Sequence, residues 1–466
     1  MQEERHAGWT AAAQPERIPF VATLATAATR WSTRWVPDAY VLAILLTVLA
    51  SVLALTFTPS TLPQLVEFWG RGFWELLSFS MQMSLIIFTG YVVAVAPPVS
   101  RLLDRLAALA RTPRGAVALM AVVSMALGLV NWGFSIVGSA VFVRFLAKRV
   151  RNVDYRLLVA AAYLGLGTTW HAGLSASAPL LVATPKHFLE KDIGIIPVTQ
   201  TIFHPFNLVL VLIVIVAMAL LTPALHPGRD ETVTVDPAVL AEMEEFTPPA
   251  RTEYTPATAL EYSPLVNWLI GLAGIAYLLL YFRGKGLAAI NINVVNFIFL
   301  TLGILLHSRP ASLLKAAEEA GRYVWGVVLQ FPFYAGIFGI VQYSGLSDQI
   351  GNWFVSFATK ETYPAIVYWY SGLLNYIVPS GGSKWAIEAP YIMKAGAQLG
   401  VPNALTVLSY AWGDMMTDII QPFWAIPLLS VAKLRFRDIM GFAVVIFLVY
   451  AVLTSVAFLA APLFFR

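Results

Sequence analysis

The chain of 466 residues is 58% hydrophobic and 12% charged, with a mean hydropathy of +0.72. Soluble proteins carry about 25% charged residues, so this composition excludes an ordinary soluble protein and indicates an all-α polytopic membrane protein. The absence of cysteine excludes disulfides, thiolate metal sites and cysteine nucleophiles. The net charge of +4 is scattered over short loops. This distribution predicts orientation in a lipid bilayer and no nucleic-acid partner.

Residues 1–36 mix acidic and basic side chains and lack the basic start and cleavable apolar core of a signal peptide. We therefore expect no signal peptide, and a first helix that itself directs insertion into the bacterial inner membrane. Alternating the predicted spans, with the basic loops on the inside, predicts a cytoplasmic N-terminal segment.

Apolar segments of membrane length follow in chain order. A helix needs about 20 apolar residues to cross the hydrocarbon core. Continuous segments near that length are 38–57, 73–97, 201–222, 263–282, 287–306, 323–343 and 438–460. Two more, 157–182 and 405–430, are interrupted by polar and helix-breaking residues and predict broken spans. The sequence thus predicts about nine full spans.

Two further apolar segments, 115–145 and 364–396, have polar centres with glycine or proline, "VNWGFSIVGS" and "NYIVPSGGSKW". Basic side chains, which favour the cytoplasmic side, flank the first segment at both ends: Arg101, Arg105, Arg111 and Arg114 before it, and Lys148, Arg149, Arg151 and Arg156 after it. A segment that begins and ends on one side is predicted to be a re-entrant hairpin. The second has charge-poor flanks and is expected to enter from the outside.

The two halves of the chain repeat the same order of unusual elements. The landmarks are Gln82, Asn131 and Pro179 in the first half, and Gln330, Asn375 and Pro422 at similar spacings in the second. An additional span near 263–282 reverses the second half, which predicts an inverted repeat. Inverted repeats with broken helices are an architecture of secondary transporters, whose sites lie at the repeat interface.

These elements divide the chain into five parts. They are the N-terminal segment 1–36, a first repeat 37–222, a cytoplasmic linker 223–262, a connecting helix 263–286 and a second, inverted repeat 287–466. Within the linker, Asp236 and Pro237 precede "AVLAEMEEF" and predict an N-cap and first residue of a short helix.

The polar hairpin centres predict an anion site. Glycines allow backbone N–H groups to approach a ligand, and a helix that starts near Lys384 points its positive dipole end at the loop. The expected substrate-binding residues are Asn131, Gly133, Ser135, Ser139, Thr169, Asn375, Ser380, Gly381, Gly382, Ser383, Lys384 and Gln421.

Carboxylates at membrane depth cost about 2.5 to 3.5 kcal/mol and indicate function. Asp414 and Asp418 lie one helical turn apart and, with Thr417, are the expected site of a coupling ion. Three alternatives remain open. Lys384 could snorkel to an interface, Asp414 could cap a half-helix, and His171 is more consistent with hydrogen-bonded packing than with a metal ligand. Trp132, Trp385 and Trp424 are expected to pack or to anchor the protein at the membrane interface, rather than to form an aromatic cage around a ligand.

Several motifs together resemble the short-chain fatty acid transporter family. They are "MQMSLIIFTGY", "NWGF", "ASAPLLVATP", "VLQFPFYAGI", "VPSGG" before "KW", and "WGD" before "IQPFWAIP", in order from about residue 30 to the C-terminus. The resemblance implies uptake of short monocarboxylates such as acetoacetate and butyrate. It also implies two hairpins in a transport domain that moves against a scaffold, in an elevator-type mechanism, and a homodimer. Lys384 and Asp418 depart from the family pattern and could pair with each other.

The expected function is secondary active transport of small monocarboxylates, coupled to Na⁺ or H⁺ and without another cofactor. One alternative is a carrier of another small organic anion on the same fold. A second is an uncoupled anion channel or uniporter, whose broken helices would line a continuous pore. No HExxH, GxSxG or P-loop pattern is present, so an enzyme is not expected.

Overall fold

The computed structural model describes residues 34, 37, 39–243 and 246–465, and this part of the chain is helical, without strands. Seven helices in it are long and apolar enough to cross a membrane. They are α2 (Ala39–Phe57), α4 (Leu77–Ala94), α6 (Pro113–Val130), α11 (Pro205–Ala224), α14 (Pro264–Phe282), α17 (Trp325–Tyr343) and α23 (Phe436–Ala460). The described chain is therefore a polytopic membrane protein, as its composition predicts.

Helix α8 (Tyr155–Ala162) and the segment up to Val182 are separated by a bend of 40°. If the two parts are counted as one broken span, they make an eighth span. The predicted span at 287–306 is the shorter helix α15 (Ile292–His307). The predicted total of about nine spans therefore stays a prediction.

All four predicted interruptions occur as breaks in helices. The segment 115–145 is α6 followed by α7 (Trp132–Arg149), and 364–396 is α19 (Tyr363–Ile377) followed by α20 (Gly381–Gln398). The segment 157–182 continues from α8 through irregular turns into α9 (Ser177–Val182). The segment 405–430 is α21 (Asn403–Met416), a short turn and α22 (Ile426–Ala432). One detail differs from expectation, because α6 alone is long enough to cross a membrane and is not a short half-hairpin.

The remaining helices connect these elements. They are α3 (Leu62–Gly72), α5 (Pro97–Ala107), α10 (Glu190–Ile193), α12 (Pro237–Glu242), α13 (Pro256–Glu261), α16 (Pro310–Gly321) and α18 (Leu346–Phe357).

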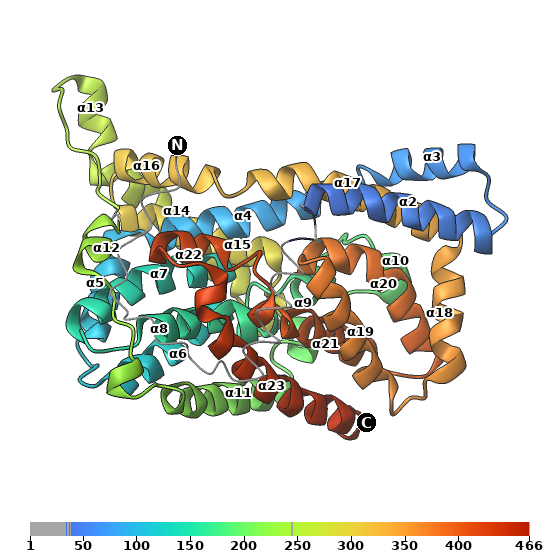
Figure 1. Ribbon diagram of the computed structural model, residues 1–466. Helices are drawn as coiled ribbons and strands as arrows, with labels where there is room; N and C mark the ends of the chain where they lie inside the picture. Colours follow the sequence, from blue (N-terminus) through green and yellow to red (C-terminus); the bar gives the residue numbers. More distant parts are fainter. Residues whose placement is uncertain (1–33, 35–36, 38, 244–245, 466) are drawn as a thin grey trace.

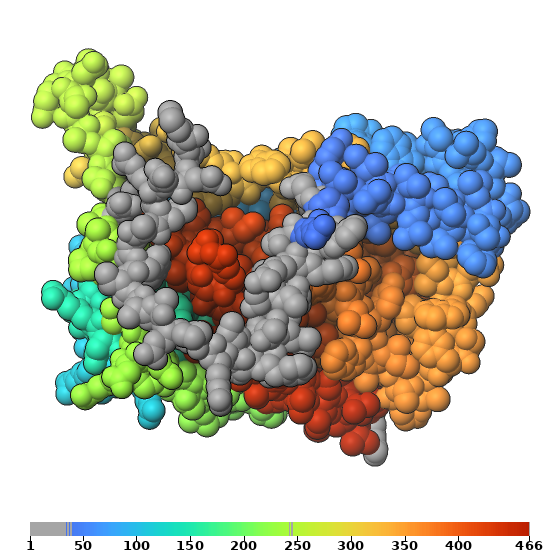
Figure 2. Space-filling view, viewed as in Figure 1, coloured from blue at the N-terminus to red at the C-terminus, as the bar shows by residue number. Residues whose placement is uncertain are grey.

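Long helices frame the broken ones. Figure 1 shows α2, α4 and α17 along one edge of the molecule and α11 with α23 along the opposite edge, while α9, α20 and α21 lie between them. In the space-filling view, α2 and α3 protrude at one end of the molecule and α13 projects at the other (Figure 2). Exposed leucine and valine side chains line α2, α11 and α14, among them Leu45, Val48, Leu212, Leu269 and Leu279. Such surfaces suit contact with lipid tails.

A buried carboxylate helps to fix the linker to the first half, beside the hydrogen bonds from Tyr155 N to Val233 O at 2.8 Å and from Asp154 N to His226 Nε2 at 3.1 Å. Asp154, which is 0% exposed, accepts hydrogen bonds from the backbone N–H groups of Leu157 and Val233, both at 3.0 Å. The Arg156 guanidinium lies 3.0 Å from the same carboxylate. The predicted cap of α12 is also confirmed, because Asp236 accepts a hydrogen bond from Ala238 N at 2.8 Å.

We predict that Asp154→Ala releases the start of the linker. A hydrogen bond to a charged group contributes about 1.5–3 kcal/mol, so local opening should rise roughly tenfold. Limited proteolysis of the purified protein should cut residues 226–262 correspondingly faster. Asp104→Ala removes an exposed ion pair with Arg149 and is the control. Equal cleavage rates in the two variants would contradict the role of Asp154.

Candidate functional site

A helix N-terminus opens at the break between α19 and α20. Ser380 is the N-cap residue, and its hydroxyl donates to Ser383 Oγ at 3.0 Å instead of capping the backbone. The first backbone hydrogen bond of α20 is made by Lys384 N to Ser380 O. The N–H groups of Gly381, Gly382 and Ser383 precede it and lie in the turn whose donors a helix leaves without partners.

A small cavity of about 30 Å³ lies against this turn. Its polar lining comes from Ser380, Gly381, Gly382 and Asp418, and its apolar lining from Met83, Trp132, Leu166, Trp170, Val327, Phe331 and Trp424. A water molecule needs at least about 10–15 Å³ of such space, so the cavity has room for one or two waters. It combines six stretches of the chain that the sequence places far apart.

The Lys384 ammonium lies behind this turn in a fully buried ion cluster. It is 3.0 Å from Asp414 Oδ1 and 3.1 Å from Glu388 Oε1, and it donates to Ser371 O at 3.0 Å. The ring of Tyr410 lies 4.4 Å from Nζ. Because Lys384 is 0% exposed, the snorkelling alternative is wrong. Lys384 is also absent from the cavity wall, so the cluster acts on the cavity through its charge and by holding α20 in place.

Asp414 joins this cluster to the first half of the chain. It lies inside α21 and does not cap a helix end, since its Oδ2 is 2.8 Å from His171 Nδ1. Ala178 N donates to His171 Nε2 at 3.3 Å, which requires a lone pair there. His171 therefore carries its proton on Nδ1 and donates it to Asp414. This arrangement confirms His171 as a hydrogen-bonded residue of the packed interior.

Asp418 is the carboxylate that reaches the cavity. Its oxygens accept hydrogen bonds from Trp170 Nε1 at 2.9 Å and Asn375 Nδ2 at 2.8 Å, both neutral donors. Among the described residues, no Lys, Arg or His lies within 4.0 Å of it. Lys384 pairs with Asp414 and Glu388, so the suggested Lys384–Asp418 pair is wrong. Asp418 is thus a buried carboxylate without a cation.

Two predicted residues lie beside Asp418. Thr417 Oγ1 donates to Gly372 O at 2.9 Å and is 3.2 Å from Asn375 Nδ2. Asn375 is 1% exposed, and its Oδ1 has no hydrogen-bond partner. An orphaned buried oxygen and an uncompensated carboxylate on neighbouring groups both attract positive charge.

The other predicted substrate residues lie away from the cavity. Asn131 Oδ1 caps α7 through Phe134 N at 3.0 Å, and Gln421 Oε1 accepts from Phe423 N at 2.9 Å. Ser135 and Thr169 donate to backbone oxygens of α6, Gly133 packs closely against Ile87, and the Ser139 hydroxyl is buried without a partner. In the described structure these side chains shape the broken helices and do not line the cavity.

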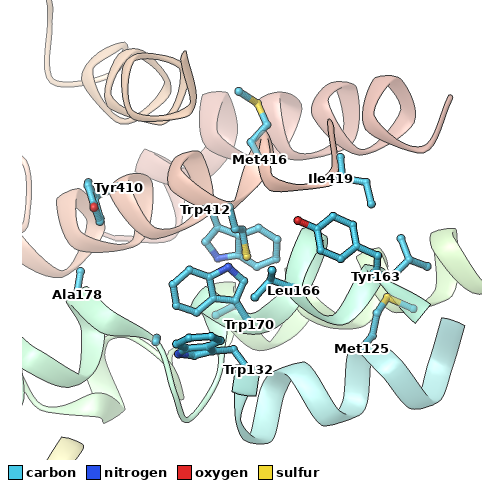
Figure 3. Close-up of a cluster of buried hydrophobic side chains, with 14 of the residues drawn as sticks. Met125, Trp132, Tyr163, Leu166, Trp170, Ala178, Tyr410, Trp412, Met416 and Ile419 are labelled. Atoms are coloured by element: carbon cyan, nitrogen blue, oxygen red, sulfur yellow. The ribbon is translucent and has the colours of Figure 1, made fainter. Parts of the chain in front are cut away.

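Aromatic rings form much of the cavity wall. Trp132 lies 6.2 Å from Trp170 and 5.3 Å from Trp424, between ring centres. Figure 3 shows Trp132 and Trp170 one above the other, with Leu166 beside them. Trp385 instead packs against Tyr410 at 4.8 Å, inside the protein. Two of the three tryptophans considered from the sequence therefore line the cavity.

Sequence reasoning missed Glu388 and the apolar wall. Glu388 follows Lys384 by one helical turn, and an acid–base pair at that spacing in an apolar segment is the signal that identifies it. Met83, Val327 and Phe331 carry no such signal, because they are ordinary apolar residues of long spans.

An apolar bundle of membrane-length and broken helices around a buried charged site is typical of a membrane transport protein. More particularly, the chain belongs to the short-chain fatty acid transporter family. The model of that family, described as "Short chain fatty acid transporter", matches residues 20–460.

Two relatives carry the name "Putative short-chain fatty acid transporter". The protein of Escherichia coli (strain K12) is 41% identical over 416 residues, which cover 89% of this chain and 94% of that protein. The protein of Haemophilus influenzae (strain Rd) is 36% identical over 421 residues, with the same two coverages. The fold is similar to that of the Alcanivorax borkumensis YdaH transporter, with a TM-score of 0.56, 18% identity, and coverage of 90% of this chain and 98% of that one.

We predict that Lys384→Met destabilises the protein by about 3–5 kcal/mol, because it leaves two carboxylates buried without a cation. Glu388→Gln should cost about 1–3 kcal/mol, since Lys384 keeps Asp414. Lys394→Met, which removes an exposed pair with Asp348, should cost less than about 1 kcal/mol. Thermal unfolding of the three variants in detergent measures the order of their stability losses. Equal losses in the Lys384 and Lys394 variants would refute the central place of the buried cluster.

Proposed function

We propose that the protein is a secondary active carrier of short-chain fatty acids and related small monocarboxylates, such as acetoacetate and butyrate, across the inner membrane. One observation carries this proposal. A single small cavity combines the first-turn N–H groups of α20, an apolar wall, and a buried carboxylate, Asp418, that lacks a cation. The chemistry of such a site matches an amphipathic anion accompanied by a cation, although the cavity must widen before an anion of this kind can enter.

The carboxylate binds at Ser380, Gly381 and Gly382. Helix N-termini favour anions through their N–H groups and dipole, and the Lys384 ammonium in the same turn adds positive charge. Two contacts hold the turn in place: Tyr410 OH donates to Gly381 O at 2.7 Å, and Trp424 Nε1 donates to Pro379 O at 2.8 Å. The donors are therefore positioned before substrate arrives.

The coupling ion, Na⁺ or H⁺, binds at Asp418, with Thr417 and the orphaned Asn375 Oδ1 beside it. Of the two carboxylates predicted for coupling, Asp414 already has Lys384 as a counter-ion. Asp418 has only neutral donors, so an arriving cation gains the most there. A cation beside the substrate carboxylate also removes the repulsion between that carboxylate and Asp418.

Related contacts in the two halves support an inverted repeat of 37–222 and 287–466, joined by the linker and the connecting helix. Thr169 in the first broken span donates to Met125 O of α6, and Thr417 in the second donates to Gly372 O of α19. In each half, a threonine ties a broken span to the preceding hairpin. An elevator-type movement of the hairpins against the long helices, with a cytoplasmic N-terminus and a dimeric assembly, completes the proposal.

A carrier explains the cavity better than a channel or uniporter does. A pore that conducts anions is continuous and wet, whereas this cavity has room for one or two waters and is walled by three tryptophans. Movement of the hairpins is needed before substrate enters, which is alternating access. A carrier for another small organic anion remains the alternative that substrate competition separates.

Gly381→Ala should abolish uptake of labelled butyrate into proteoliposomes. A β-carbon at Gly381 would lie 2.5 Å from Asp414 Oδ2 and 2.8 Å from the Trp170 ring, so the turn must move. Gly326→Ala is the matched control, because its nearest neighbour is 3.9 Å away. Both variants should reconstitute as folded protein. Normal uptake by a folded Gly381→Ala variant, or failure of wild-type protein to take up any short monocarboxylate, would overturn the proposed function.

Asp418→Asn should uncouple transport. We expect exchange of labelled for unlabelled butyrate across the liposome membrane to persist. The factor by which an imposed Na⁺ or H⁺ gradient stimulates uptake should fall about tenfold or more. Parallel assays of Asp104→Asn, on the surface, provide the control. Gradient dependence equal to that of wild-type protein would remove Asp418 from coupling.

A further inference from the structure

The two glycines at the start of α20 face different surroundings. A β-carbon on Gly381 would point at Asp414, Trp170 and His171. A β-carbon on Gly382 would instead meet the tips of two aromatic rings, Phe331 at 3.1 Å and Phe79 at 3.3 Å. The charged cluster therefore lies on one side of the turn and an aromatic surface on the other.

The aromatic side is built by the long helices α4 and α17. Phe331 is 4% exposed and packs edge-to-face on Phe79, with ring centres 5.7 Å apart. Met83, also 4% exposed, and Val327 line the same cavity. None of these four side chains carries a charge or a strong hydrogen-bonding group that a second carboxylate or a hydroxyl of a substrate could use.

The space between them is too small for an acyl chain as it stands. A cavity of about 30 Å³ holds one or two waters, so each methylene of a bound acid must displace a side chain. Methionine adapts readily because it is unbranched and has three rotatable bonds. A phenylalanine wedged between a neighbouring ring and a helix backbone adapts less, and overpacking of such a core is unfavourable.

We propose that Met83, Val327 and Phe331 form an acyl-chain pocket and that Phe331 sets the longest chain the protein accepts. This inference rests on the proposed function and specifies its ligand as a linear monocarboxylate whose far end is apolar. The head group lies at the start of α20, and the tail lies against α4 and α17. Dicarboxylates and acids hydroxylated at the far end are excluded, because their polar ends meet an apolar surface.

The pocket has a measurable consequence for chain length. Burial of one methylene changes affinity about fourfold. Removal of the Phe331 ring opens an apolar space, and enlarged apolar cavities bind apolar groups. Phe331→Ala should therefore favour the two additional methylenes of hexanoate over butyrate by about tenfold.

The test is competition against labelled butyrate uptake in proteoliposomes, with acetate, butyrate, hexanoate, octanoate and succinate as unlabelled competitors. In wild-type protein, hexanoate and octanoate should compete less well than butyrate, and succinate should not compete. In Phe331→Ala, the ratio of the hexanoate to the butyrate inhibition constant should fall about tenfold. Phe331→Leu should produce a smaller shift in the same direction and serves if the alanine variant does not fold.

Phe333→Ala is the matched control. Phe333 lies on the same helix but packs on Phe73 and Trp69, at 5.5 and 6.4 Å between ring centres, away from the cavity. Its variant should keep the wild-type ratio.

If both Phe331 variants take up butyrate with an unchanged ratio of hexanoate to butyrate inhibition constants, the acyl-chain pocket is overturned and the proposed function stands. The same conclusion follows if succinate competes as well as butyrate does. A shift equal in the Phe333 variant would also overturn the pocket. Loss of wild-type butyrate uptake is instead the failure of the proposed function.

Discussion

The structure depends on one buried ammonium. Lys384 connects three helices at once, since it contacts the backbone of α19 at Ser371, Glu388 on its own α20, and Asp414 on α21. Through Asp414 the same cluster reaches His171 in the other half of the chain. A buried charge that loses its counter-ion is costly, so these helices must stay in register for the cluster to persist. The position of the α20 N-terminus follows from that register.

The proposed selectivity of the site rests on the difference between neighbouring surfaces. Charge and N–H donors lie on the Gly381 side, and aromatic and aliphatic side chains lie on the Gly382 side. Asp418 lines the same cavity and accepts hydrogen bonds from the neutral donors Trp170 and Asn375. Such a site favours an anion with an apolar tail when a cation accompanies it, and it disfavours either ion by itself. In the proposed function, coupling and substrate choice have one physical origin, which is the cost of uncompensated charge in a low-dielectric interior.

The sequence predicted much of the fold and part of the site. Length, apolar segments and helix breakers were sufficient for the spans and for breaks such as those at Asn131 and Ser380, because these depend on local composition. These sequence features did not predict which buried polar side chains contact one another. The pairing of Lys384 with Asp414 and Glu388, and the isolation of Asp418, depend on side-chain directions across four helices. The proposed acyl-chain pocket could not be predicted from the sequence for a different reason, since Phe331 is one of many apolar residues in a long span.

Accumulation of labelled butyrate by the purified wild-type protein in liposomes, under separately imposed proton and sodium gradients, tests the central claim most directly. A coupled carrier predicts that one of the two gradients raises internal butyrate above its external concentration, and that an ionophore collapsing this gradient abolishes the excess. Equilibration to the external concentration under both gradients, without any excess, would contradict the account.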